Sequence, residues 1–391
     1  MTNLKQHPLN RFSLERRDRW FLAILLLCSF TFSLTLYLRG TAITPGGPAL
    51  ATAETAKAIW ESGSLSSHYA RAVFEDASTL SRTTHSDVWQ DVFAIDVRGN
   101  LIAKHSVISS LIAAPLFGMF GTIGFWLCQQ VFFVTLSVSF YRCVRALSGV
   151  SLPWTSLLAI CFFSPALWSS YTFNYDLHGV TFLLLGLSLS RTRPFLGSFA
   201  MACSVFVRPS YILLIPPLLF AWHKPGVHKR FMRMGFGAMA PIFLFLLYNT
   251  YFWGDPLVTT YSRLPRWMDG VMYLDDLSLG FDLVEFRSRW ALKLWGSDGL
   301  FSQYGVILTL PCAVWMAVSS NHTRFFRACL VSAILNILFA FSYGMWEPGV
   351  SPNRFLHPSI FLFLIPFTVL IGHLERGFKT QSTSMRESRP E

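Results

Sequence analysis

The chain has 391 residues, of which 52% are hydrophobic, 16% aromatic and 14% charged. Soluble domains carry about 25% charged residues, so this composition excludes an ordinary soluble enzyme and indicates a protein solvated largely by lipid. The formal net charge of +11 is compatible with nucleic-acid binding, anionic lipid binding or membrane topology, and the positions of the charges decide among them.

Apolar stretches of near-spanning length recur along the chain and predict transmembrane helices. In chain order they cover residues 20–38, 122–141, 152–170, 178–190, 194–208, 210–222, 234–252, 301–319, 325–342 and 358–372, which makes ten predicted spans. The first stretch is longer than the apolar part of a typical signal peptide, which favours an uncleaved span.

Lysine and arginine residues gather in short segments at alternate ends of these stretches. Short basic loops face the cytoplasm in most membrane proteins. The basic balance is therefore a topology signal, and nucleic-acid binding is not indicated. Both termini are expected inside, and the long loops 39–121 and 253–299 are expected outside, within a single membrane domain 1–391.

Two further patterns limit the chemistry. The apolar stretch Ser106–Phe120 would place Arg142 and Arg145 outside if it crossed the membrane, so we expect it to lie in the outer interface. All seven cysteines lie in or beside apolar stretches without a CxxC pair. This placement favours core packing over a disulfide framework or a metal site.

None of the ten predicted spans carries a charged residue at mid-depth. Ion-coupled transporters usually need ionisable groups or broken helices there, so a transporter or flippase is a weaker alternative. Ionisable residues gather instead at the outer ends, where they suit chemistry on a lipid phosphate or, alternatively, only cap the spans. They are Lys104, Asp176, His178, Arg208, Arg263 and Arg354.

Six stretches, taken in order, resemble the GT-C superfamily of membrane glycosyltransferases, especially the branch related to protein mannosyltransferases and lipid A aminoarabinose transferases. They are Ala51–Leu65, Asp96–Gly121, Ser164–Gly179, Val207–Pro209, Gly254–Tyr261 and Trp346–Pro358.

The resemblance implies an all-α integral membrane fold whose long first outer loop carries interfacial helices. It implies transfer of a sugar from a polyprenyl-phosphate donor, such as an undecaprenyl phosphate, to a lipid, glycan or protein acceptor outside a bacterial cytoplasmic membrane. No cofactor is required by the sequence, and a divalent metal is compatible with it.

The resemblance also implies roles for basic residues near the donor phosphate. Lys104 stands where the family has a lysine before an interfacial helix, Arg208 ends the fifth span, and Arg354 lies near the last outer loop. The alternatives are a snorkelling lysine and arginines that anchor the interface. Tyr261 and Arg263 would contact donor or acceptor, or else lie in an exposed loop.

Acidic residues are the candidates for catalysis. Asp176 matches the family's acid at the outer end of the fourth span, with N-capping of a helix as the alternative. His178, two residues on, would assist it or be structural. The acid that the family usually carries early in the first outer loop is missing here, because Gly46–Pro48 occupies that place.

A sugar transfer that inverts the configuration at the anomeric carbon needs a base to deprotonate the acceptor hydroxyl. The remaining acids of the first loop that could serve are Glu54, Asp91 and Asp96, and for Glu54 the alternative is a solvated helix face. If none serves as the base, the chain is a degenerate relative that binds polyprenyl lipids without turnover.

Overall fold

The computed structural model describes most of the chain, with gaps near both ends and in the long loops. The described residues are 48–66, 93–104, 107–149, 151–170, 173–222, 228–258, 260, 264–268, 271–275, 290–296, 299–302, 305–320, 322–342 and 354–387, with scattered residues between 20 and 35. Much of the predicted first span, 20–38, therefore lies outside the described residues.

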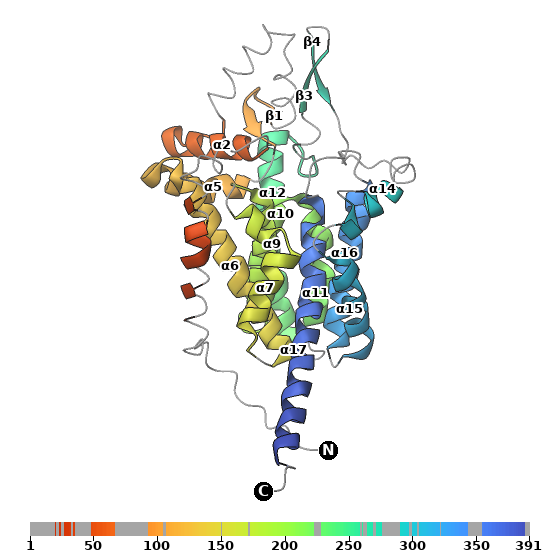
Figure 1. Ribbon diagram of the computed structural model, residues 1–391. Helices are drawn as coiled ribbons and strands as arrows, with labels where there is room; N and C mark the ends of the chain where they lie inside the picture. Colours follow the sequence, from red (N-terminus) through yellow and green to blue (C-terminus); the bar gives the residue numbers. More distant parts are fainter. Residues whose placement is uncertain are drawn as a thin grey trace.

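The body of the molecule is a bundle of helices that lie side by side (Figure 1). In chain order they are α6 (Ile123–Ser148), α7 (Pro153–Phe163), α9 (Tyr175–Ser190), α10 (Pro194–Val207), α11 (Ile215–Trp222), α12 (His228–Trp253), α15 (Val306–Ser319), α16 (Thr323–Ser342) and α17 (His357–Glu387). The core is made of large apolar side chains, and Phe133, Leu183 and Phe361 have no exposed surface. Most of these helices follow the predicted apolar stretches.

Prolines and a glycine set the ends of several helices. Pro153 and Pro194 stand at the start of α7 and α10, where the missing N–H of proline has no intrahelical partner to lose. Gly149 ends α6 in the left-handed conformation with φ of 69°, which glycine adopts without a steric penalty. These residues confine the connections α6–α7 and α9–α10 to short turns.

Helices α9, α10 and α12 approach each other closely at glycines. A Cβ on Gly197 of α10 would lie 2.5 Å from the backbone N of Ser190, and one on Gly186 of α9 would lie 2.5 Å from the carbonyl oxygen of Gly197. Gly237 of α12 likewise makes room for the carbonyl of Phe195. Small residues let membrane helices approach in this way, so these glycines set the spacing of the three helices.

By length and composition, four described helices can cross a membrane. They are Ile123–Ser148, His228–Trp253, Thr323–Ser342 and His357–Arg376. A fifth is obtained if the segments Lys293–Ser302 and Val306–Ser319, bent by 73°, form one span. Helices α7 and α10 and the segment Pro209–Ala221 are apolar but shorter. The count of ten spans therefore stays a prediction.

One end of the bundle carries additional elements (Figure 1). They are α2 (Pro48–Ser62), β1 (Phe93–Ile95), β2 (Leu101–Ala103), α5 (Val107–Phe120), β3 (Leu264–Met268), β4 (Val271–Asp275) and α14 (Trp290–Trp295). The strands form two antiparallel hairpins, β1 with β2 and β3 with β4. The expectation of an all-α chain is therefore corrected in the long loops, where short hairpins accompany the helices.

Helices α2 and α5 lie across this end of the bundle and pack on each other (Figure 1). The Ser110 hydroxyl donates to the Thr52 carbonyl at 2.8 Å, and further along both helices Gly118 faces the ring of Trp60. Met119 remains 61% exposed. Exposed apolar side chains on a helix that lies across a bundle end suit the membrane interface.

Candidate functional site

The first turn of α9 places an acidic side chain at the bundle end that carries α2 and α5. Asn174 is the N-cap residue of α9, and its side-chain oxygen accepts a hydrogen bond from the Asp176 backbone N–H at 2.9 Å. Asp176 is therefore not the cap, contrary to one of the two sequence-based alternatives. Its carboxylate forms an ion pair with another residue.

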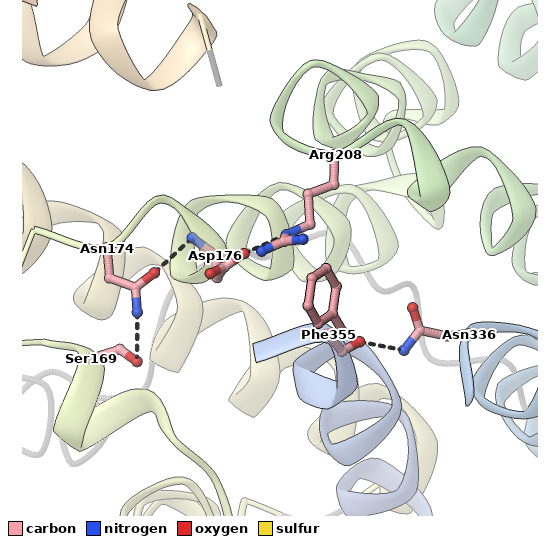
Figure 2. A network of polar contacts seen from close by, with 6 residues as sticks. All are labelled: Ser169, Asn174, Asp176, Arg208, Asn336 and Phe355. Atoms are coloured by element: carbon pink, nitrogen blue, oxygen red, sulfur yellow. Dashed lines mark hydrogen bonds and ion pairs between the residues drawn. The ribbon is translucent and has the colours of Figure 1, made fainter. Parts of the chain in front are cut away.

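That partner is Arg208, which follows α10 in an extended conformation with φ of −146° and ψ of 124°. The next residue, Pro209, disfavours a helical conformation at Arg208. Figure 2 shows the guanidinium of Arg208 pointing toward Asp176. The Arg208 Nε donates to Asp176 Oδ1 at 2.5 Å, and only 6% of the arginine side chain and 2% of the aspartate side chain are exposed. The pair joins the start of α9 to the end of α10.

Aromatic rings flank the guanidinium of Arg208. Its Cζ lies 4.4 Å from the centre of the Phe355 ring and 5.6 Å from that of Tyr175, distances at which a ring face attracts a cation. Phe355 belongs to the short helix η4 (Arg354–Leu356), and its carbonyl accepts from Asn336 Nδ2 at 2.8 Å (Figure 2). The middle of α16 and the start of α17 are thus tied to the same charged pair.

His178, the fourth residue of α9, is completely buried. Its Nε2 lies 2.9 Å from Gln129 Oε1 and its Nδ1 lies 2.7 Å from Ser109 Oγ. Gln129 Oε1 also accepts the Asn174 backbone N–H at 3.2 Å, so a neutral His178 carries its proton on Nε2 and accepts from Ser109 at Nδ1. Both nitrogens bond to protein atoms, which favours the structural interpretation of His178 over direct substrate contact.

Two consecutive serines of α5 connect three helices. Ser109 contacts His178 of α9, whereas Ser110 donates to the carbonyl of Thr52 in α2. All four residues are buried. The helices that lie across the bundle end are therefore fixed directly to the helix that carries the acidic side chain.

Glu54 and Lys104 are also buried beside α5, with 8% and 6% of their surfaces exposed. Glu54 lies on α2 and bonds to Lys57 Nζ at 3.1 Å, so it does not form the solvated face that was the alternative for it. Lys104 follows β2 directly, and its carbonyl accepts from Thr260 Oγ1 at 2.7 Å. The burial of Lys104 also argues against a snorkelling side chain.

Asp96 has a different role, because its carboxylate shapes the turn between β1 and β2. Oδ1 accepts from the backbone N–H groups of Arg98 at 2.9 Å and Asn100 at 2.7 Å, and Oδ2 accepts from Asn100 Nδ2 at 3.0 Å. Val97 N–H in the same turn donates to the carbonyl of Phe252 at 2.9 Å, which docks the hairpin on the end of α12. These contacts favour a structural role for Asp96.

The other candidates fall partly or wholly outside the described residues. Asp91, Tyr261 and Arg263 are not described, and of Arg354 only the backbone, in η4, is described. Within the described part of the chain no group of three or more His, Cys, Asp or Glu residues could hold a metal ion.

The six stretches that carry the family resemblance contact one another in a continuous series. Thr52 and Ser110 join the first two stretches, Ser109 and His178 the second and third, and Asp176 and Arg208 the third and fourth. Thr260 joins the fifth stretch to the second, and Phe355 joins the sixth to the fourth. Asp176 and Arg208 are thus in direct contact, and Lys104 lies just before the helix that is bonded to α9.

Sequence reasoning missed several residues of this network, namely Ser109, Gln129, Asn174, Tyr175, Asn336 and Phe355. Gln129 and Asn336 stand within apolar helices and are buried. A buried polar residue in such a helix is usually bonded to another polar group, and this would have been the signal. Tyr175 and Phe355 adjoin residues that were singled out, but their sequence carries no sign that both rings flank one guanidinium.

No family model matches this sequence, and no curated protein matches it. Among solved structures, the chain is similar to ArnT from Cupriavidus metallidurans in a crystal structure bound to undecaprenyl phosphate, with a TM-score of 0.57 and 12% sequence identity. The match covers 95% of this chain and 63% of that protein, so the chain spans less than two thirds of its length. The likeness shows that the chain shares the fold of that protein, and the four long apolar helices support an integral membrane protein.

Proposed function

We propose that the protein is a membrane glycosyltransferase that moves a sugar from a polyprenyl-phosphate donor to an acceptor at the bundle end carrying α2 and α5. The observation that carries the proposal is the buried Asp176–Arg208 pair at that end. It occurs in a fold shared with a protein that binds undecaprenyl phosphate.

In the proposed reaction the bond from sugar C1 to the phosphate oxygen breaks, and the polyprenyl phosphate leaves with both bonding electrons. Positive charge placed at that phosphate stabilises the transition state. Arg208 suits this role because Asp176 holds the guanidinium through Nε, one of its five donors. Arginine also binds phosphate in a bidentate manner. Lys104 supplies a second, compact positive charge.

Three further residues are assigned by their chain neighbours. Arg354 directly precedes Phe355, whose ring faces Arg208, and we assign it to the same phosphate. Tyr261 and Arg263 follow Thr260, which bonds to the Lys104 carbonyl, and we assign them contacts with donor or acceptor.

Glu54 is the base that we favour. The acceptor hydroxyl must give its proton to a base as its oxygen attacks C1. The carboxylate of Asp96 shapes its own turn and that of Asp176 binds Arg208. Glu54 lies on α2, which is connected through α5 to the helix of Asp176. Asp91 stays the second candidate.

The test is donor turnover by the purified full chain in lipid nanodiscs with a panel of polyprenyl-phosphate sugars. Wild type is expected to release polyprenyl phosphate, and Glu54→Gln is expected to lower the rate roughly 100-fold or more, as for loss of a general base. Glu61→Gln, which removes an exposed acid from the same helix, is the matched control and should turn over like wild type. Equal rates for Glu54→Gln and wild type would remove Glu54 as the base.

A second candidate function is lipid binding without turnover, favoured by the absence of a carboxylate at Gly46–Pro48. The same experiment separates the two. If no donor of the panel is consumed while polyprenyl phosphate still binds in an Arg208-dependent way, the protein is a binder and the transferase proposal fails.

A further inference from the structure

The end of the bundle opposite the Asp176–Arg208 pair gathers positive charge from several helices. We define the basic cluster as Arg142, Arg191, Arg230, His322, His373 and Arg376. Arg142 lies near the end of α6, Arg191 directly after α9, Arg230 at the start of α12, His322 before α16, and the last two on α17. Among the described side chains at this end, Glu375 is the acidic residue in the same part of α17.

Part of the cluster has a folding role. Arg191 Nη1 donates to the Ala146 carbonyl at 2.6 Å, near the end of α6. Arg230 Nη2 donates to the carbonyls of Ser190 and Arg191 at 2.8 and 2.6 Å, at the end of α9. The last carbonyls of a helix have no intrahelical partners, and cations near them interact favourably with the helix dipole. These bonds explain why arginines stand there.

Helix capping does not balance the charge of the cluster. Each helix end carries roughly half a negative charge, so the ends of α6 and α9 supply about one negative charge beside the four arginines, and Glu375 on α17 supplies one more. Arg230 is bonded to the Arg191 carbonyl, and burial together with this neighbouring cation lowers the pKa of Arg191. The Nε of Arg230 is buried without a hydrogen-bond partner among the described residues. An anionic group at this place would relieve the repulsion.

Exposed apolar side chains lie near Arg191 and Arg230. Phe195 and Phe199 of α10 stack with ring centroids 6.4 Å apart and are 43% and 37% exposed. Phe236, further along α12 from Arg230, is 60% exposed. The surface is cationic at the end of the helices and apolar along their length. This combination matches an amphiphile with a charged headgroup and acyl chains better than it matches a free phosphate ion.

We propose that the basic cluster binds the phosphate headgroup of an anionic phospholipid in the leaflet opposite the Asp176–Arg208 pair. The acyl chains lie along the exposed side chains of Phe195 and Phe199 on α10 and Phe236 on α12. Basic pockets between membrane helices bind cardiolipin and similar headgroups in this way. The site is separate from the proposed sugar transfer, so it stands or falls independently of that function.

The experiment measures which lipids the purified full chain retains, by native mass spectrometry after reconstitution with equal amounts of phosphatidylglycerol, cardiolipin and phosphatidylcholine. Wild type is expected to retain the anionic lipids preferentially. The double variant Arg191→Gln/Arg230→Gln is expected to lose this preference by about tenfold or more, from two lost headgroup contacts. No preference in wild type would overturn the proposal.

Arg324→Gln is the matched control for Arg230→Gln, since Arg324 is an exposed arginine at the start of α16 on the same end. Each variant loses one charge, and only Arg230→Gln should weaken retention. Equal losses would show attraction by overall charge and no defined site. Displacement of the lipid by millimolar inorganic phosphate alone would identify a free-phosphate site and overturn the lipid assignment.

A further variant separates lipid binding from helix capping. Arg191→Lys/Arg230→Lys keeps both charges but loses the forked guanidinium geometry, and it serves also if the glutamine variant does not fold. It should keep most of the anionic preference. If it loses the preference as fully as a glutamine substitution, capping geometry controls retention and the proposal fails.

Discussion

Asp96 and Asp176 are both buried carboxylates at the same end of the molecule, yet they are held in opposite ways. Among the described residues, the hydrogen bonds that the Asp96 carboxylate accepts come from its own turn, from Arg98 and Asn100. Asp176 instead binds Arg208, which comes from the end of a different helix. A carboxylate bonded within a turn organises a few residues, whereas a carboxylate in an interhelical pair balances a distant buried charge. The two aspartates should therefore respond differently to the same substitution.

The largest effect is expected for Asp176→Ala, because it leaves the Arg208 charge buried without its carboxylate. Breaking a buried pair from one side costs about 3–5 kcal/mol, which should appear as a large drop in the apparent Tm in detergent. Donor turnover should be lost as well. A Tm equal to that of wild type would contradict the buried pair.

The double variant Asp176→Ala/Arg208→Met sharpens this result. Replacing a buried pair on both sides with apolar groups is often neutral for stability, so most of the lost Tm should return. Turnover should not return, because the proposed phosphate ligand is gone. If the losses of the two single variants simply add in the double variant, the residues do not interact.

A smaller effect is expected at the hairpin, where Asp96→Ala removes three hydrogen bonds and should cost about 2 kcal/mol. Asp96→Asn keeps an oxygen for the two backbone N–H groups and should cost less than about 1 kcal/mol. Protease sensitivity of the hairpin measures both variants. Donor turnover in Asp96→Asn should stay near wild type, and its complete loss would make Asp96 a catalytic candidate again.

Asn174→Ala removes the N-cap of α9 and should cost about 1 kcal/mol. The same cap positions the backbone of Asp176. We therefore expect donor turnover to fall clearly even though the apparent Tm changes little. Asn174→Asp, which retains a capping oxygen, is the matched control. Equal behaviour of both variants in turnover would show that the cap does not position Asp176.

The smallest stability effect is expected for Glu54→Gln. Its partner Lys57 is 35% exposed, and ion pairs of this kind contribute roughly 0–1 kcal/mol. The apparent Tm should therefore change by a few degrees at most, while turnover collapses as described above. A large drop in Tm would indicate that Glu54 is a packing residue and explain lost activity without a base.

Much of the fold could be predicted from local sequence, because long apolar stretches must become helices when lipid is the solvent. The prediction of a helix near Ser106–Phe120 rested on the same logic, and the structure places α5 at Val107–Phe120. The start of α9 was placed at 178 instead of Tyr175, since the capping role of Asn174 depends on one side-chain rotamer. The hairpin around Asp96 was missed because strands of three residues leave no periodic pattern.

The site could be predicted only in part. Asp176, Arg208 and Lys104 were recognisable because charged residues at span ends are few. Their partners were not, since the contact of Phe355 with Arg208 depends on how α16 and α17 pack against α9. The tautomer and bonding of His178 depend likewise on Gln129 and Ser109, which lie on two other helices.

The glycine contact between α9 and α10 has a mechanical consequence. Gly186 lies about 15 Å along the helix axis from Asp176 at 1.5 Å per residue, and the two backbones touch there. A tilt of α10 by roughly 10° about this pivot would displace its far end by about 3 Å on that lever arm, which is enough to separate Arg208 from Asp176. The ion pair is therefore sensitive to the angle between the two helices, whereas the glycine contact at the pivot is not.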